Sequence, residues 1–422
     1  MERFIIKGPN KAVKGEVNIS GAKNSCLPLM AASILFKDKV ILNNVPFVKD
    51  VFTMKDLLVS LGARVDFSVL EKKMTIKNKI NHKLIVPYNL VSTMRAGVLT
   101  MGPLLARYPQ KKIKVALGGG CALGVRDTNW HLAGFKSLGA INNLRKGYVN
   151  ISSKNGLIGD KYKFPKVTVT GTSNLIMASI FVKGFHYLKN ISIEPEVIDL
   201  INFLNNSGAK IKFIGKRSIK ITGVKELISG NHKIIGDRIE AFSYLCVGAI
   251  TNGNIKINNI NSNHLSSEIR TLKKIGHKIE IKNNSINLYS VRKPKSVNIK
   301  TGPFPNFATD NMPILLALLS TINGKSQIEE TIFSNRFMAA PELNRMGANI
   351  TIKKNKAIII GQKKLNAADC ISSDLRTTFS IILGAISATG ISTIRRVYHG
   401  LRGYYNLKLK LKKLGIKIKS KK

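Results

Sequence analysis

A short pattern recurs six times along this chain of 422 residues. In each copy an apolar or amphipathic run ends at a glycine, and a stretch of alternating apolar and polar residues follows, as in SLGARVDF around Gly62. The six glycines lie 68 to 77 residues apart, at Gly62, Gly139, Gly208, Gly276, Gly347 and Gly415. Because self-similarity at a fixed period is the signature of a repeated structural unit, the sequence predicts six copies of one unit of about 70 residues.

Each predicted unit contains two helices of different character. The first is apolar on nearly all sides, which is typical of a helix buried against its neighbours. These runs lie at residues 25–36, 93–108, 172–184, 239–253, 312–324 and 377–390. The second helix is amphipathic and ends at the repeat glycine, and short strands separate the two. The alternation predicts an α/β fold in which buried helices lie inside and sheets lie outside, with three repeats in each of two domains.

The composition is that of a globular protein, with 44% hydrophobic residues and 34 glycines. The longest apolar stretches, such as residues 312–322, fall well short of the roughly 20 residues that span a bilayer. The N-terminal sequence MERFIIKGPNKAVKGEV lacks the apolar core of a secretory signal, so we expect a cytoplasmic protein without membrane insertion. Its four cysteines form no C-x-x-C pair and its histidines are widely spaced, and we therefore expect neither a metal site nor a disulfide framework.

The formal net charge of +45 raises the question of a nucleic-acid partner. However, 52 of the 68 basic residues are lysines, and they are spread over every repeat among many asparagines and isoleucines. Proteins that read bases favour the planar fork of arginine. We therefore interpret the charge as compositional drift of exposed positions and expect no specific nucleic-acid partner. In the basic segment 407–422, the apolar positions Leu407, Leu409, Leu411 and Leu414 suit a final helix and strand.

Charged and polar residues stand at the starts of the apolar helices. Asparagine, threonine, aspartate and serine there are ordinary N-caps, and Asn24, Thr172, Asp310 and Ser373 are suitable ones. Capping does not account for the cations Lys23, Arg95, Arg238 and Arg376, because a positive charge at a helix N-terminus opposes the helix dipole. Several helix N-termini combined with cations would attract an anion. The pattern favours a small ligand that carries phosphate or carboxylate groups, with solvated surface cations as the alternative.

A glycine-rich segment surrounds one of the cysteines. Gly118, Gly119 and Gly120 precede Cys121, and Arg126 follows five residues later. The spacing fits neither a dinucleotide-binding fingerprint nor a Walker loop. A thiol in such a loop is accessible, and Arg126 would favour its thiolate if the loop folds back, which makes a reactive thiol or a proton donor one interpretation and an incidental loop cysteine the other. In contrast, Cys26 and Cys246 lie within apolar helices, where we expect them to be inert.

Nine motifs in order along the chain resemble the enolpyruvyl transferases that act on UDP-N-acetylglucosamine. They are G-x-V-x-I-S-G-A-K-N at 15–24, TMRA at 93–96, GGCALGVR at 119–126, EPE at 194–196, DRIE at 237–240, ATD at 308–310, NRFM-x-x-PEL-x-RMGA at 335–348, SDLR at 373–376 and RGY at 402–404. The resemblance covers nearly the whole chain and implies two inside-out α/β barrel domains of three repeats each. We expect one domain at residues 22–235 and the other at 1–21 plus 236–422, with the active site in the cleft between them.

The resemblance implies transfer of the enolpyruvyl group of phosphoenolpyruvate to the 3-hydroxyl of UDP-N-acetylglucosamine by addition and elimination, with release of phosphate. This is the first committed step of peptidoglycan synthesis, and hence serves cell-wall formation, cell shape and division. Both substrates are polyanions, in agreement with the cations at the helix starts. No cofactor and no metal are implied, and we expect a monomer.

The motifs also imply roles for individual residues. Cys121 resembles the general acid that can hold a covalent phosphoenolpyruvate adduct, and Asp310 resembles the carboxylate that accepts the hydroxyl proton. Lys23, the third catalytic residue, belongs with Arg126 and Arg402 among the cations on the phosphoenolpyruvate side. Asn24 is expected near the reacting hydroxyl; Arg95, Lys166, Val167, Thr168, Val169, Asp310 and Ile332 are expected to contact the nucleotide sugar; Arg336 and Arg376 are expected near the cleft.

This chain departs from the family pattern at three places. After Arg126 the family's Pro-Val-Asp-x-His is replaced by DTNWH at 127–131, Ile193 replaces an arginine before EPE, and Leu401 replaces an aspartate before Arg402. The first change falls in the expected uridine pocket. Two alternatives are a sister enzyme that acts on shikimate 3-phosphate, which lacks a Gly-Gly-Cys loop, and a basic RNA-binding protein built on a degenerate transferase fold.

Overall fold

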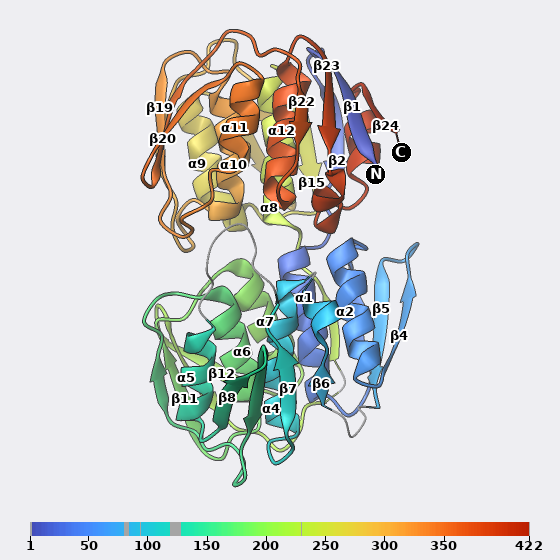
Figure 1. The fold of residues 1–422 in the computed structure, drawn as a ribbon, viewed down its shortest axis with the longest axis vertical. Coiled ribbons are helices and arrows are strands. Elements are labelled where there is room, and N and C mark those ends of the chain that lie inside the picture. The colour runs from blue at the N-terminus through green and yellow to red at the C-terminus, as the bar shows by residue number, and fades with distance from the viewer. Residues whose placement is uncertain (1, 80–83, 93, 119–127, 229, 422) are drawn as a thin grey trace. The chain divides into compact units, whose positions relative to one another are not determined.

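A computed structural model describes residues 2–79, 84–92, 94–118, 128–228 and 230–421. Contacts between residues divide the chain into two units (Figure 1). Unit 1 contains Met1–Ser20 and Gly236–Lys422, and unit 2 contains Gly21–Gly120 and Val125–Ile235. Unit 2 is therefore inserted into the sequence of unit 1, which holds both ends of the chain.

One supersecondary motif builds both units, in mixed α/β content as the sequence predicted. The second repeat shows it: a strand, a buried helix, a parallel strand, a second helix and a β-hairpin follow one another. Its elements are β6 (Ile85–Val86), α3 (Tyr88–Val91), η2 (Arg95–Thr100), α4 (Met101–Arg107), β7 (Ile113–Ala116), α5 (Asn129–Ser137), β8 (Ile141–Arg145) and β9 (Tyr148–Ser152). The strands form a sheet in the order β6-β7-β9-β8, in which β6 and β7 are parallel and the other pairs are antiparallel.

The other two repeats of unit 2 follow the same plan. The first consists of α1 (Lys23–Ala32), η1 (Ser33–Leu35), β3 (Val40–Asn43), α2 (Lys49–Ser60), β4 (Ala63–Ser68) and β5 (Lys73–Asn78). The third consists of β10 (Lys161–Lys163), α6 (Val169–Ala178), β11 (Phe185–Lys189), α7 (Pro195–Asn206), β12 (Lys210–Gly215) and β13 (Ser218–Thr222), and β14 (Gly230–Lys233) follows it. Their sheets have the orders β14-β3-β5-β4 and β10-β11-β13-β12.

Unit 1 repeats the plan three more times. The N-terminal strands are β1 (Arg3–Gly8) and β2 (Lys14–Asn18). The fourth repeat contains α8 (Arg238–Ile250), β15 (Asn254–Asn258), η3 (Ser262–Leu265), α9 (Ser266–Ile275), β16 (Lys278–Lys282) and β17 (Ser285–Tyr289). The fifth contains β18 (Asn298–Lys300), η4 (Thr309–Asn311), α10 (Met312–Leu319), β19 (Lys325–Glu329), α11 (Ala339–Arg345), β20 (Asn349–Lys353) and β21 (Lys356–Ile360). The sixth contains β22 (Asp369–Ile371), α12 (Leu375–Ser387), β23 (Gly390–Arg395), η5 (Val397–Arg402), α13 (Leu407–Lys413) and β24 (Ile418–Lys421).

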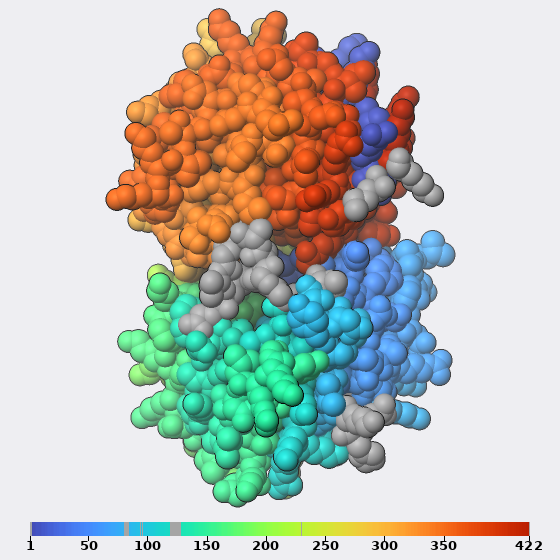
Figure 2. Space-filling model, viewed as in Figure 1, coloured from blue at the N-terminus to red at the C-terminus, as the bar shows by residue number. Residues whose placement is uncertain are grey.

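Strands distant in sequence complete three of the sheets. In the sixth repeat the chain reaches only the first strand of its hairpin, β24, and the N-terminal strand β1 takes the place of the second, giving the order β22-β23-β1-β24. Figures 1 and 2 show the blue N-terminal segment beside the red C-terminal one in unit 1. Strand β2 pairs in parallel with β15, and β14 pairs in parallel with β3. Each unit is thus closed by strands from opposite ends of its own sequence.

The six repeat glycines terminate the second helix of each repeat. All six have positive φ angles, from 82° at Gly139 to 113° at Gly276. A left-handed residue just after the last helical turn ends a helix, and glycine adopts this conformation without a steric penalty from Cβ. The prediction that these glycines stop the amphipathic helices is therefore confirmed.

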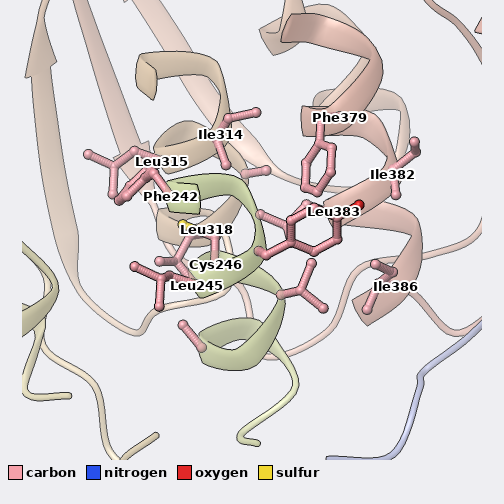
Figure 3. Close-up of a cluster of buried hydrophobic side chains, with 14 of the residues drawn as sticks. Phe242, Leu245, Cys246, Ile314, Leu315, Leu318, Phe379, Ile382, Leu383 and Ile386 are labelled. Atoms are coloured by element: carbon pink, nitrogen blue, oxygen red, sulfur yellow. The ribbon is translucent and has the colours of Figure 1, made fainter. Parts of the chain in front are cut away.

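The first helices of the repeats form the apolar interior. In unit 1, Figure 3 shows side chains of α8, α10 and α12 pointing toward one another, among them Phe242, Leu315 and Phe379. Every residue of α10 is buried. In Figure 1, helices α8 and α10 of unit 1 lie between strands β19 and β23, which are at its outside. Since burial of one large apolar side chain stabilises the fold by about 1.5–3 kcal/mol, these helix contacts supply much of the driving force for folding.

Several predicted details of the helix ends were wrong. Thr168 caps α6 in place of Thr172, and Asp374 caps α12 in place of Ser373. Asn24 lies inside the first turn of α1, where no side chain caps the helix. The predicted starts were late because the first turns are polar and hide the apolar pattern. Leu409 lies in α13 as the sequence predicted, but it is 51% exposed, since it lies on the opposite side of this helix from the buried leucines.

Two buried histidines should make the stability of the protein fall in mild acid. Burial lowers the pKa of His186 and of His277 to about 4, and the two residues are 0% and 2% exposed. The unfolded chain binds protons near the ordinary histidine pKa, whereas the folded protein does not, so the contribution of these two side chains to the free energy of unfolding should be constant above pH 7. It should decline as the pH falls from about 6.5 toward 4, by up to about 3 kcal/mol for each histidine.

Urea titrations at several pH values measure this effect. A variant with both His186→Gln and His277→Gln should show a much shallower decline between pH 6.5 and pH 5, a range in which most carboxylates remain ionised. An equally steep decline in the double variant would contradict the assignment to these two side chains.

Candidate active site

Asp310 lies between two arginine side chains in unit 1, on the single turn η4. Its Oδ1 accepts a hydrogen bond from Arg336 Nη2 at 2.6 Å, and its Oδ2 accepts hydrogen bonds from Arg376 Nη2 and Nε at 2.9 and 3.2 Å. The arginine side chains are 2% and 3% exposed, whereas that of Asp310 is 28% exposed. The predicted N-cap role of Asp310 was wrong, because the carboxylate pairs with guanidinium groups and no side chain caps η4 or α10. The result is a solvent-accessible carboxylate backed by two buried cations.

Glu330 connects Thr309, the residue before Asp310, to the segment that contains Ile332. One carboxylate oxygen accepts a hydrogen bond from Thr309 Oγ1 at 3.0 Å, and the other accepts from the backbone N–H groups of Ile332 and Phe333 at 2.7 and 3.1 Å. Glu330 is buried, and Ile332 is 39% exposed. This buried carboxylate therefore fixes Ile332 relative to η4 while leaving its side chain partly open to solvent.

Arg376 is held at the start of α12 by its surroundings. The carboxylate of Asp374 accepts hydrogen bonds from the backbone N–H groups of Arg376 and Thr377 at 2.8 and 3.2 Å. Burial alone would lower the pKa of Arg376, but the charge of Asp310 outweighs it, and the pKa is raised above its ordinary value. The guanidinium carbon lies 5.5 Å from the ring centroid of Tyr404. The segment from Arg402, which is half-buried, to Tyr404 thus reaches the same cluster.

Lys23 forms an ion pair in unit 2. It is the first residue of α1, and its Nζ lies 3.1 Å from Oδ2 of Asp50, near the start of α2. The two side chains are 11% and 5% exposed. Asn24 follows within the first turn and is half-buried. The start of α1 therefore presents an ammonium group held by a buried counter-ion, with an amide side chain next to it.

The predicted nucleotide-sugar segment precedes α6. Lys166 and Val169 are exposed, and Val167 and Thr168 are half-buried. Thr168 Oγ1 accepts a hydrogen bond from the backbone of α6 at 3.3 Å, which fixes the turn. On either side of this segment the chain contacts the first turn of α5: Tyr162 Oη donates to the carbonyl oxygen of Trp130 at 2.9 Å, and Thr170 Oγ1 lies 3.4 Å from His131 Nε2. These contacts join the residues that flank the segment to the part of the chain that departs from the family motif.

Three of the predicted site residues cannot be placed from side-chain geometry. Cys121 and Arg126 lie outside the described residues. Arg95 is the first residue of η2, and its side chain is likewise outside the description.

The three described cysteines are buried thiols. Burial raises the pKa of Cys26 and Cys246 above the ordinary value, and it raises the pKa of Cys370 to about 12. A thiol that does not ionise near neutral pH is a poor nucleophile. Cys26 and Cys246 are buried within α1 and α8, as the sequence predicted.

Sequence reasoning did not find Asp50, Glu330 and Tyr404. Tyr404 belongs to the RGY motif, and Asp50 lies in the first turn of a helix, where an acidic residue usually complements the helix dipole. Interaction with the helix dipole was therefore a sufficient explanation for Asp50, and nothing in the sequence indicated an ion pair with Lys23. Glu330 gave no signal at all, because its partners are the Thr309 hydroxyl and two backbone N–H groups, whose positions depend on the fold.

The described side chains suit anion chemistry. A carboxylate beside two buried guanidinium groups can bind a hydroxyl group, and the cations can attract phosphate or carboxylate. Within the described ranges, histidine, cysteine, aspartate and glutamate form no group of three or more that would hold a metal ion. None of the described helices combines the length and apolar character that crossing a bilayer requires.

Comparison with known proteins links this chain to one family. The family model described as EPSP synthase (3-phosphoshikimate 1-carboxyvinyltransferase) matches residues 7–411. A UDP-N-acetylglucosamine 1-carboxyvinyltransferase of Pelagibacter ubique (strain HTCC1062) is 46% identical over 419 residues, which cover 99% of both chains. Proteins with the same name from Trichlorobacter lovleyi and Campylobacter jejuni (strain RM1221) are 42% and 43% identical and are also covered almost completely, at 99% and 98% of both chains.

Solved structures share the fold at lower identity. The enolpyruvyl transferase NikO from Streptomyces tendae aligns with a TM-score of 0.89 at 20% identity, covering 99% of this chain and 98% of NikO. An EPSP synthase from Acinetobacter baumannii aligns over the whole of both chains with a TM-score of 0.80 at 18% identity.

Proposed function

The chain belongs to the enolpyruvyl transferase family, and we propose from this membership that it transfers the enolpyruvyl group of phosphoenolpyruvate to the 3-hydroxyl of UDP-N-acetylglucosamine. The reaction releases phosphate and commits the sugar nucleotide to peptidoglycan synthesis. Relatives that carry the name of this activity are 41–46% identical over nearly the full chain, whereas the EPSP synthase structures are 17–18% identical. The difference in identity favours UDP-N-acetylglucosamine over shikimate 3-phosphate as the acceptor.

The observation that carries the proposal is the pairing of Asp310 with Arg336 and Arg376. Addition to phosphoenolpyruvate requires removal of a proton from the sugar hydroxyl and protonation of the substrate methylene carbon, followed by loss of phosphate from a tetrahedral intermediate. A general base, a general acid and cations for the developing charge are therefore needed. Asp310 provides the accessible carboxylate, and the arginines provide positive charge beside it.

The arginine pairs suggest how the base becomes available. Arg336 and Arg376 donate hydrogen bonds to both carboxylate oxygens of Asp310, so these oxygens are occupied while both arginines remain bound. An anionic substrate competes for the same cations. Binding of phosphate or carboxylate groups to Arg336 or Arg376 would release Asp310 to accept the hydroxyl proton. Substrate binding and activation of the base are then linked.

Residues of both units serve the substrates in this proposal. Lys23, Arg126 and Arg402 neutralise phosphoenolpyruvate, and Cys121 donates the proton to the methylene carbon. The ion pair of Lys23 with the buried Asp50 holds its ammonium group in place. Asn24 orients the reacting hydroxyl. Arg95, residues 166–169, Asp310 and Ile332 hold the nucleotide sugar, and the altered first turn of α5 contacts Tyr162 and Thr170, which lie on either side of residues 166–169.

We also propose that each unit is an inside-out α/β barrel of three repeats, with unit boundaries near residues 21 and 236. The buried first helices and the four-stranded sheets that surround them support this arrangement. The protein is expected to act in the cytoplasm as a monomer, without a cofactor. Its lysine-rich surface is not assigned to a nucleic-acid partner.

A phosphate-release assay tests the proposed function. Phosphate should appear with phosphoenolpyruvate and UDP-N-acetylglucosamine together, and not when either is omitted, because elimination follows addition to the hydroxyl. Shikimate 3-phosphate is the matched control acceptor and should give no release. Release with shikimate 3-phosphate alone as acceptor would assign the chain to the sister reaction. Salt-sensitive RNA retention without any phosphate release would favour the RNA-binding alternative.

A further inference from the structure

A buried carboxylate joins three elements of unit 2 beside the predicted phosphoenolpyruvate residues. Asp199 lies on α7 and is 4% exposed. Its Oδ2 accepts a hydrogen bond from Ser25 Oγ on α1, and its Oδ1 lies 2.8 Å from His232 Nε2 on β14. The backbone N–H of Ile235 lies 3.5 Å from Oδ2. One side chain thus connects α7 to the first turn of α1 and to the segment that ends unit 2.

The same three residue types occur in hydrolytic triads, but this arrangement cannot act as one. In a triad the imidazole lies between the serine and the carboxylate and removes the serine proton. Here Asp199 lies between Ser25 and His232, and Ser25 is completely buried. The serine hydroxyl is therefore a hydrogen-bond donor to a carboxylate and not an activated nucleophile. A role in holding the backbone fits the geometry better.

The hydrogen bond between Ser25 and Asp199 anchors the first turn of α1 through a side chain. The residue before the helix, Ala22, provides no side-chain cap, although the first turn of a helix leaves backbone N–H groups without intrahelical partners. Ser25 is the third residue of the helix, directly after Lys23 and Asn24. The hydrogen bond from Ser25 to Asp199 fixes the backbone at that point. The Asp50 ion pair fixes only the end of the flexible lysine side chain.

Ser25, Asp199 and His232 form one hydrogen-bond network, and His232 is itself held in place by its neighbours. His232 pairs with Leu42 in the parallel ladder between β14 and β3, and its ring centroid lies 5.5 Å from that of Phe203. Phe203 in turn packs against Phe36 at 5.3 Å. Because strand pairing and aromatic packing limit the motion of His232, the imidazole fixes the carboxylate of Asp199 instead of following it.

We propose that Asp199, supported by His232, is a positioning residue that acts through Ser25 to set the first turn of α1 and with it Lys23 and Asn24. This inference rests on the proposed function, in which Lys23 and Asn24 serve phosphoenolpyruvate and the reacting hydroxyl. The network contacts neither substrate directly. It controls where the ammonium and amide groups stand when phosphoenolpyruvate binds.

Steady-state kinetics of the full-length protein test the proposal. Asp199→Asn and Ser25→Ala should raise the KM for phosphoenolpyruvate at least tenfold and lower kcat. The KM for UDP-N-acetylglucosamine should rise much less, because Asn24 is only one of several residues proposed to hold that substrate. Partial unfolding would reduce the amount of active enzyme and lower kcat alone, so the split between the two KM values identifies positioning. Unchanged KM values, or equal increases in both, would overturn it.

His232 offers a matched pair of variants. His232→Gln keeps a side-chain donor for Asp199, and its KM for phosphoenolpyruvate should stay within about threefold of that of the unmodified protein. His232→Leu removes the donor and should resemble Asp199→Asn. Equal KM values for the glutamine and leucine variants would contradict the proposed support of Asp199 by His232.

Hydrogen exchange provides a readout that does not need activity. In Ser25→Ala the amides of residues 25–27 should exchange at least about tenfold faster, while those of α8 in unit 1 should not change. Alanine has a high helix propensity, so this variant does not weaken α1 through its intrinsic preference. Unchanged exchange at α1 would refute the positioning role. Absence of phosphate release by the unmodified protein would instead refute the proposed function, and the exchange result would still decide the role of the network.

Discussion

Replacing Cys121 with alanine should reduce the rate of phosphate release at least about a hundredfold, the lower end of what general acid–base catalysis contributes. The proposed reaction requires a proton donor for the methylene carbon, and the other cysteines cannot substitute. Cys26, Cys246 and Cys370 are buried, and burial raises the pKa of each thiol. The expected loss is therefore specific to one residue.

Mass spectrometry of the native protein gives an independent measurement. Incubation with iodoacetamide near neutral pH should modify one thiol, that of Cys121, whereas all four should react after unfolding in urea. Incubation with phosphoenolpyruvate should add the mass of one substrate molecule to the unmodified protein and none to Cys121→Ala. The control Cys246→Ala should retain the rate of phosphate release, since its sulfur lies in the core shown in Figure 3. Full activity of Cys121→Ala would exclude the proposed acid role.

Replacing Asp310 with asparagine should lower kcat by about a hundredfold to ten-thousandfold, because the amide cannot accept the hydroxyl proton. The asparagine keeps the shape of the side chain and a carbonyl oxygen that can accept from Arg336. It nevertheless removes the negative charge that faces Arg336 and Arg376, whose side chains are 2% and 3% exposed. Because Asp310 is 28% exposed, leaving the buried arginines without this partner should also reduce the free energy of unfolding by about 1–3 kcal/mol, the usual cost of an unsatisfied buried donor.

Kinetics and urea unfolding of the same preparation separate these two effects. The control Glu329→Gln removes a carboxylate at the end of β19, where it pairs with the exposed Lys300 at 2.9 Å. Such a surface pair contributes little, so both activity and stability should stay close to those of the unmodified protein. If Asp310→Asn kept more than a tenth of the original kcat, Asp310 would not be the general base. If its stability were unchanged, the arginine pairs would not depend on this charge.

Much of the fold was predictable because its signals are local. The stop at each repeat glycine follows from the conformational freedom of that residue, and all six glycines have the positive φ angle that the interpretation required. Burial of the first helices follows from their apolar composition, as α10 shows. The exact helix starts at Thr168 and Asp374 were missed because polar first turns carry no apolar period.

The candidate site was predictable only as a set of residue types. Charges at helix starts indicated an anionic ligand, and the motif order identified the family. The partners of each charge were not predictable, because ion pairs join positions that have no periodic relation. Asp310 meets one arginine 26 residues away and another 66 residues away. Asp199 and Ser25 are 174 residues apart.

By itself the sequence determined the six-fold period, the buried helices, the helix stops and the resemblance to enolpyruvyl transferases, since each of these depends on neighbouring residues or on a contiguous motif. Only the tertiary structure decided that β1 completes the sheet of the sixth repeat, that β14 completes the sheet of the first, and that Asp310 lies between two buried arginines. These contacts join distant segments, and their energies depend on packing and burial that no local pattern records.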